Sequence, residues 1–172
     1  MNVTGYQLMR ALKELAFDKE TAEGVFDDSI WKFENETKPT PPEAMVAYHK
    51  AEAAFANVQA AQAIYNQKID VDVKNQRMTL GLAIKLVGGA GRMEKKWRDI
   101  SKPKKKDRFD FTDGLQRKRD EGTEYAVKQI KTEDAQVLAK GAAKYAAALR
   151  EAIQIGNSSE LHIDGLDPAL FE

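Results

Sequence analysis

The stretch TEDAQVLAKGAAKYAAALREAIQI, residues 132–155, carries the clearest helical pattern in the chain. Apolar or small residues recur three and four positions apart, at Ala135, Leu138, Ala142, Tyr145, Leu149 and Ala152. Because an α-helix has about 3.6 residues per turn, this spacing gathers them on one face. A second row of small residues lets neighbouring helices approach closely, at Ala139, Ala143 and Ala146. The stretch therefore predicts a helix in the middle of a bundle.

Both ends of this helix have local signals. Thr132 is the expected N-cap, and Glu133 and Asp134 place negative charge at the positive end of the helix dipole. Gly156-Asn157 predicts a left-handed residue that closes the helix.

Composition limits the class of protein. The chain has 172 residues, with 27 basic and 27 acidic side chains and no cysteine. That balance gives no overall field for nucleic acid or anionic membranes, and the lack of cysteine excludes thiolate chemistry and Cys-based zinc sites. We find neither a signal-peptide pattern near the N-terminus nor a long apolar run. We therefore expect a cytoplasmic protein with no membrane contact.

Three further helices precede residue 101. Thr4 and Gln7 have capping-box spacing, and an apolar stripe follows from Leu8 to Phe33. Thr40, Pro41 and Glu43 form a strong start signal for a second helix, whose stripe is Ala44, Tyr48, Ala51, Phe55, Val58, Gln62 and Tyr65. The third helix is expected at residues 79–100, with one apolar side made of Leu82, Leu86, Gly89, Met93 and Ile100.

The segments between and after these helices read differently. Ile69, Val71 and Val73 alternate with polar residues and favour a short strand. Residues 104–131 predict an inserted β-hairpin. Residues 157–172 contain apolar residues among acidic ones and predict a tail that docks on its own bundle or on a neighbour's. The fold class is therefore mainly α: one domain, residues 1–172, formed by an up-down bundle of four long helices that pack as in a coiled coil, with a small hairpin between helices three and four.

Two motifs have ordinary structural explanations. Gly88, Gly89 and Gly91 resemble a phosphate-binding loop, but they lie inside a helical pattern and lack the Walker-type lysine, so we interpret them as close-packing positions. His49 with Glu52 and His162 with Asp164 are interpreted as surface or tail histidines, because no second ligand pair or nucleophile accompanies them. We expect no metal, no cofactor and no catalytic residue.

Charge is concentrated in residues 92–119, which hold twelve basic and five acidic side chains, a net charge of +7 that leaves −7 elsewhere. Such a segment could bind an anion, nucleic acid or an acidic partner, and Trp97, Phe109 and Phe111 would suit stacking on bases. The alternative is that it forms a solvated helix end or meets the acidic tail of a neighbouring subunit. The candidate contact residues are Arg92, Lys95, Lys96, Lys104, Lys105, Lys106, Arg108, Arg117, Lys118 and Arg119.

Three short segments resemble a group of small bacterial helical proteins labelled septicolysin. They are Leu8-Met-Arg-Ala-Leu12, Met78-Thr-Leu-Gly-Leu82 and Leu149-Arg-Glu-Ala-Ile-Gln-Ile-Gly-Asn157, which are 19 of the 172 residues. This sequence departs from that family in its Gly-Gly-Ala-Gly run and in lacking a tryptophan after Asn157. The resemblance implies an oligomeric helical bundle with an inserted hairpin and no established activity.

These observations favour a non-enzymatic, self-associating helical scaffold or interaction protein. A nucleic-acid or anion-binding module that uses residues 92–119 is the alternative, and an enzyme with a polar site in the bundle is a third hypothesis. A single bundle has no obvious place for Phe17, Val25 and Trp31, and exposed apolar patches usually mark interfaces. We therefore expect a homo-oligomer.

Overall fold

The computed structural model describes residues 1–102 and 129–171. Its helices are α1 (Gly5–Ser29), α2 (Pro41–Lys68), α3 (Leu80–Ser101) and α4 (Thr132–Ser158). Its strands are β1 (Asn2–Thr4), β2 (Asp70–Val73), β3 (Gln76–Thr79) and β4 (Glu160–His162), and a short 3₁₀ helix spans Pro168–Leu170. The predicted mainly α class is therefore confirmed.

The chain divides into two compact units. Met1–Lys85 and Leu149–Glu172 form the first, and Leu86–Ala148 forms the second. The first unit holds α1, α2 and both strand pairs, and the second holds the later part of α3 and the earlier part of α4.

Local signals explain where α1 and α2 begin. The Thr4 hydroxyl accepts the Gln7 amide N–H at 3.3 Å, while the Gln7 side-chain oxygen accepts the Thr4 amide N–H at 2.9 Å, which completes the predicted capping box. At α2 the Glu43 carboxylate accepts the amide N–H of Thr40 at 2.9 Å, and Pro41 is the first helical residue. Both helix starts were correctly predicted.

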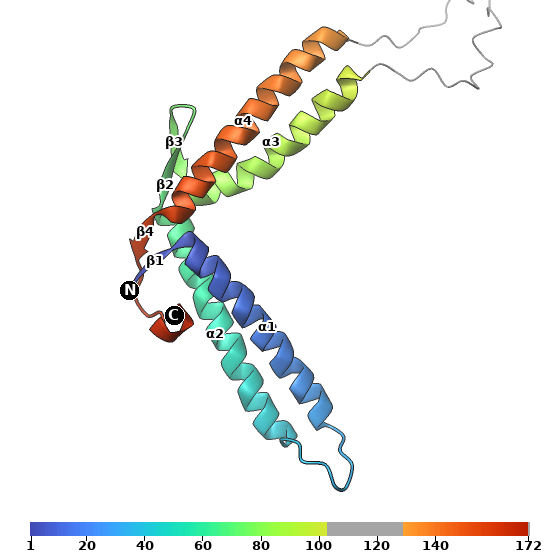
Figure 1. Cartoon of the computed structure of the whole chain (residues 1–172), viewed down its shortest axis with the longest axis vertical. Helices are drawn as coiled ribbons and strands as arrows, with labels where there is room; N and C mark the ends of the chain where they lie inside the picture. Colours follow the sequence, from blue (N-terminus) through green and yellow to red (C-terminus); the bar gives the residue numbers. More distant parts are fainter. Residues whose placement is uncertain (103–128, 172) are drawn as a thin grey trace, which may run out of the picture. The chain divides into compact units, whose positions relative to one another are not determined.

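The two helices lie side by side and antiparallel in the first unit (Figure 1). The predicted stripe of α2 is the observed inner face, with Ala44, Val58 and Tyr65 buried. On α1 the stripe holds only as far as Ser29. Ile30 and Phe33 were predicted inside the helix but lie beyond its end and are exposed, because the helix stops before them.

Two small antiparallel strand pairs flank the helices. β2 and β3 form a hairpin whose turn residues Lys74 and Asn75 have φ of 49° and 66°, as a two-residue type I′ turn requires. The sequence predicted a strand here but not its partner. β1 pairs with β4, Val3 opposite Leu161, and brings the two ends of the chain together (Figure 1).

A buried node, which we call the Tyr65 junction, is formed by Gly5, Tyr65, Gly156 and Asn157. The Tyr65 hydroxyl lies 2.6 Å from the carbonyl oxygens of Gly156 and of Ser159, to either of which it can donate, and it accepts the amide N–H of Gly5. Tyr65 is fully buried, and that burial raises the pKa of its hydroxyl. One side chain thus joins the start of α1 to the end of α4.

Gly156 was predicted to end α4 with a left-handed backbone, and this is wrong. The helix continues to Ser158, and the only described glycine with positive φ is Gly165, at 77°. Gly156 is needed for space, because a Cβ there would lie 2.8 Å from Val71 Cγ1 and 2.9 Å from Leu80 Cδ1. Gly5 is equally confined, at 2.4 Å from Asn157 Oδ1. Close approach explains both glycines.

The inner faces of α3 and α4 were predicted with different success. On α4, Ala135, Ala146, Leu149 and Ala152 are buried as expected, although Leu138 is exposed. On α3 the predicted face is wrong, since Leu82 and Met93 are exposed and the buried residues are Leu80, Ala83 and Ala90. Residues 104–128 of the predicted hairpin lie outside the described residues, and the single-domain prediction stays a prediction.

Candidate interaction surface

The loop end of the α1–α2 pair exposes five large apolar side chains, which we call the tip patch. Val25 lies in the last turns of α1, Ile30, Trp31 and Phe33 lie in the connecting loop, and Val46 lies in the second turn of α2. Their exposed fractions are 41% for Val25, 52% for Ile30, 82% for Trp31, 83% for Phe33 and 70% for Val46. Water therefore contacts several large apolar side chains at this end of the first unit.

The tip loop has a defined local structure. The Glu36 carboxylate accepts the Phe33 amide N–H at 3.2 Å, and the Glu36 amide N–H donates to the Phe33 carbonyl oxygen at 3.0 Å. The Phe33 N–H, followed by the ammonium group of Lys38 at 3.1 Å, holds the pKa of Glu36 below its usual range. Hydrogen bonds to Glu36 thus fix the backbone of Phe33, while its ring is exposed to solvent.

The tip is also acidic. Residues 23–46 hold six acidic and two basic side chains, a net charge of −4. Asp27 and Asp28 lie in the last turn of α1, which has no basic residue. The carbonyl end of a helix carries partial negative charge and is stabilised by cations, so these two aspartates oppose the stability of α1.

A polar cluster joins α1 and α2 away from the tip. Lys19 Nζ lies 3.1 Å from Glu52 Oε2 and 5.5 Å from the centroid of the Phe55 ring. The Lys19 bond lowers the pKa of Glu52 and the Glu52 bond raises that of Lys19, while a hydrogen bond to Glu52 raises the pKa of Tyr48. These shifts keep each group in its ordinary protonation state at neutral pH, so the cluster fits an ion pair that holds two helices together better than an acid–base site.

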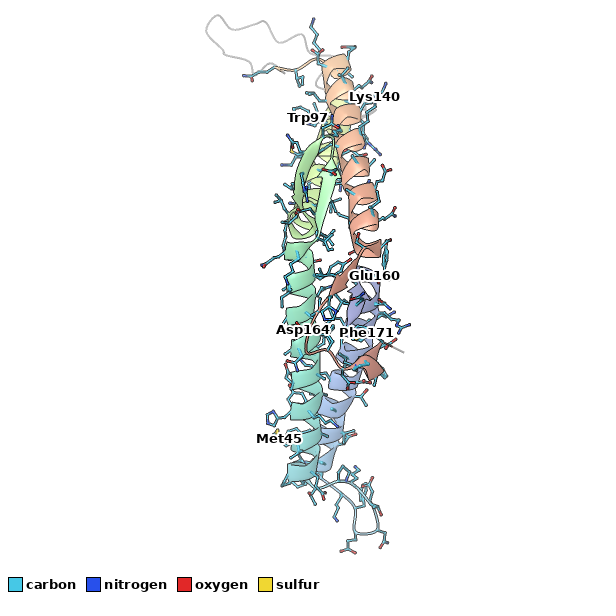
Figure 2. All side chains as sticks on the ribbon, turned by 90° about the vertical axis from the view of Figure 1, so that its left-hand side faces the viewer. Met45, Trp97, Lys140, Glu160, Asp164 and Phe171 are labelled. Atoms are coloured by element: carbon cyan, nitrogen blue, oxygen red, sulfur yellow. The ribbon has the colours of Figure 1, made fainter. Side chains whose placement is uncertain are left out.

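Shallow pockets border these helices. One of about 190 Å³ is lined by Glu23, Phe26, Asp27, Met45 and Tyr48. Two others, of about 270 and 380 Å³, lie where the C-terminal tail crosses α1 and α2. Figure 2 shows Asp164 and Phe171 of this tail beside the two helices. None of these pockets gathers the set of groups that a reaction would need.

The predicted basic residues fall in two groups. Arg92, Lys95 and Lys96 lie on α3 and are exposed. Two neighbouring cations form ion pairs: Arg98 pairs with Glu94 on α3, and Lys102, just beyond the helix, pairs with Asp99 and lowers its pKa. The other predicted contact residues lie outside the described part of the chain, namely Lys104, Lys105, Lys106, Arg108, Arg117, Lys118 and Arg119.

Within residues 1–102 and 129–171, the glycines of α3 have room around them. A Cβ built on Gly89 or Gly91 meets nothing within 4 Å, and one on Gly88 meets only the flexible end of Arg92, at 3.5 Å. Close packing of two helices at these three positions therefore stays a prediction.

The two histidines are distant in sequence and contact different residues. His49 is exposed and its ring lies 5.9 Å from that of Tyr48, while Glu52 is paired with Lys19 instead. The ring nitrogens of His162 lie 3.1 Å from Asn2 Oδ1 and 3.0 Å from Asp164 Oδ1. In residues 1–102 and 129–171 no group of three or more acidic or histidine side chains could hold a metal ion.

Comparison with protein-family models, curated proteins and solved structures finds no match to this chain. Of the helices in the described ranges, none is long and apolar enough to cross a membrane.

Sequence reasoning found no burial place for Phe17, Val25 and Trp31, and all three are exposed in the structure. It missed that Phe33 and Ile30 join Val25 and Trp31 at the tip, because it continued α1 through the loop.

Proposed function

We propose that this chain is a non-enzymatic helical scaffold or interaction protein that associates with itself. The observation that carries the proposal is the tip patch, where Trp31 and Phe33 are each more than four-fifths exposed. Exposed aromatic side chains at one end of a helix pair are typical of interface anchors, because their burial against a partner is favourable. Up-down bundle packing of the long helices, the hairpin between helices three and four and a cytoplasmic location remain parts of this proposal.

Sedimentation equilibrium of the full chain tests the proposal. We expect a mass above that of one chain that rises across micromolar concentrations, as reversible association requires. The mass of a single chain at every concentration would contradict self-association.

The alternative function is binding of an anion or of nucleic acid by the basic end of α3. Support comes from the exposure of Arg92, Lys95 and Lys96 and from the net charge of +7 in residues 92–119. Phosphate contacts release counterions, so such binding weakens steeply as salt rises. Titration of labelled single-stranded and double-stranded oligonucleotides at two salt concentrations tests it, with Lys140→Glu/Lys144→Glu as the charge-matched control for Arg92→Glu/Lys96→Glu.

A further inference from the structure

The tip patch combines two properties that together restrict its partner. Trp31 and Phe33 are exposed on a loop in which the Glu36 carboxylate accepts the Phe33 N–H, and residues 23–46 carry a net charge of −4. The charge opposes an anionic membrane surface. It equally opposes contact with the tip of another copy, because two like-charged surfaces would meet.

The aspartates at the end of α1 strengthen this restriction. Asp27 and Asp28 lie where a helix is stabilised by cations, so their presence costs α1 stability instead of supporting it. A role in recognising a binding partner would explain why these two aspartates are present although they oppose folding. The surface that recognises them should be basic and should offer apolar contacts to Trp31 and Phe33.

The end of α3 has these properties. Residues 92–102 hold five basic and two acidic side chains, a net charge of +3. Arg92 and Lys96 are both exposed and lie four residues apart, on the same side of the helix. Met93, beside them in the sequence, is 44% exposed and offers an adaptable apolar contact.

We propose that the tip patch of one copy docks on the basic end of α3, around Arg92 and Lys96, of a second copy. This inference rests on the proposed self-association and specifies its geometry. The two surfaces differ, so the contact is heterologous and leaves one tip and one basic end free on each pair. Repetition of the contact forms a ring if the rotation closes and an open chain if it does not.

The apolar half of the contact is tested by Trp31→Ser/Phe33→Ser in the full chain. Both side chains are more than 80% exposed, so the fold should be retained, which circular dichroism checks. We expect the association constant from sedimentation equilibrium to fall by about tenfold or more. Phe17→Ser, at a position 68% exposed on the same helix pair but outside the tip, should leave it unchanged.

The electrostatic half is tested by exchanging the charges. Asp27→Lys/Asp28→Lys changes the net charge of residues 23–46 from −4 to 0, and Arg92→Glu/Lys96→Glu changes that of residues 92–102 from +3 to −1. Each variant therefore removes the charge complementarity and should weaken association. One chain that carries all four changes has the net charge of the original protein, and positions 27 and 28 are again opposite in charge to positions 92 and 96, so association should return. Lys140→Glu/Lys144→Glu also reverses two exposed basic residues four apart, on α4, and should have no effect.

The outcomes separate the two proposals. If the original chain has the mass of one chain throughout, self-association and its geometry both fail. If the chain associates but the tip variant does so equally well, or the four-change variant does not recover, only the docking geometry fails. Flotation with phosphatidylcholine vesicles that requires Trp31 and Phe33, while association does not, would assign the tip to a lipid surface and overturn the proposal.

Discussion

The two ends of the α1–α2 pair are built from similar helices and differ in what meets them. At the Tyr65 junction the start of α1 and the end of α2 are joined by β1, β4 and the end of α4, and Gly5 and Gly156 leave no room for a methyl group. At the tip only one loop connects the helices, and Trp31 and Phe33 remain in water. The large apolar side chains that are buried in the pair, such as Leu8, Val58 and Tyr65, thus lie away from the tip, where the small Ala44 is buried.

The largest expected effect lies at the junction end. Leu149→Asp places a carboxylate at a fully buried position, and we expect the free energy of unfolding to fall by more than about 4 kcal/mol. Val46→Asp, at a 70% exposed position of the tip, should change it little. Urea unfolding followed by circular dichroism gives both values, and similar losses at the two positions would remove the contrast between the ends.

Two glycines of α1 should respond with opposite signs. Gly5→Ala brings a Cβ within 2.4 Å of Asn157 Oδ1 and should cost about 1–3 kcal/mol. Gly24→Ala, near the tip, meets nothing within 4 Å and should stabilise by up to about 1 kcal/mol through helix propensity. Thermal unfolding of the two variants sharpens the comparison, and a stabilised Gly5→Ala protein would show that the junction is loosely packed.

Tyr65→Phe tests the polar part of the junction. The change removes a hydroxyl that donates to the Gly156 or Ser159 carbonyl and accepts the Gly5 N–H, so we expect a loss of about 1–3 kcal/mol. Tyr48→Phe, on the half-buried face of α2, is the control that removes a hydroxyl outside the junction.

Tyr65→Phe should also alter the dependence of stability on pH in the alkaline range. Burial raises the pKa of Tyr65, so the unfolded chain loses this proton at a lower pH than the folded chain. Stability from this group is present below the ordinary pKa of tyrosine and is lost as pH rises through the folded value. Between the ordinary pKa and the raised folded pKa, stability should fall less steeply with pH for Tyr65→Phe, and an unchanged slope would mean that water reaches the hydroxyl.

The smallest effect is expected between the two ends, at the Lys19–Glu52 ion pair. Lys19 lowers the pKa of Glu52, so its contribution is present above the ordinary pKa of glutamate and is lost as pH falls through the folded value. Glu52→Gln should therefore lower the melting temperature slightly at neutral pH and not at all in acid or in high salt. Glu20→Gln, which also removes one carboxylate from an exposed position of α1, is the charge-matched control.

Local signals explain what could be predicted from the sequence. The caps at Thr4 and Thr40 involve residues three positions apart, so they can be recognised without knowing the fold. Non-local contacts explain the failures. Gly156 faces Val71 and Leu80, which are distant in sequence, and the turn at Lys74-Asn75 contains no glycine to mark it.

The candidate site divides in the same way. Exposure of Val25 and Trp31 could be anticipated, because a stripe of limited width has no place for them. Membership of Phe33 in the tip patch depended on where α1 ends, and apolar spacing alone continued the helix too far. On α3, alanines at 83 and 90 are buried in place of larger residues, so counting bulky apolar side chains selected the wrong face.

The pairing of β1 with β4 has a consequence for folding during synthesis on the ribosome. The ammonium group of Met1 donates to the Ile163 carbonyl oxygen across 162 positions, and the carbonyl partners of Tyr65 lie 91 and 94 positions downstream. A ribosome that adds about 5–20 residues per second needs roughly 10–30 s to span the first of these intervals. Residues 86–148, which form a continuous unit, are made within that time. During synthesis the junction end of the α1–α2 pair therefore stays incomplete until residues 156–163 have been made.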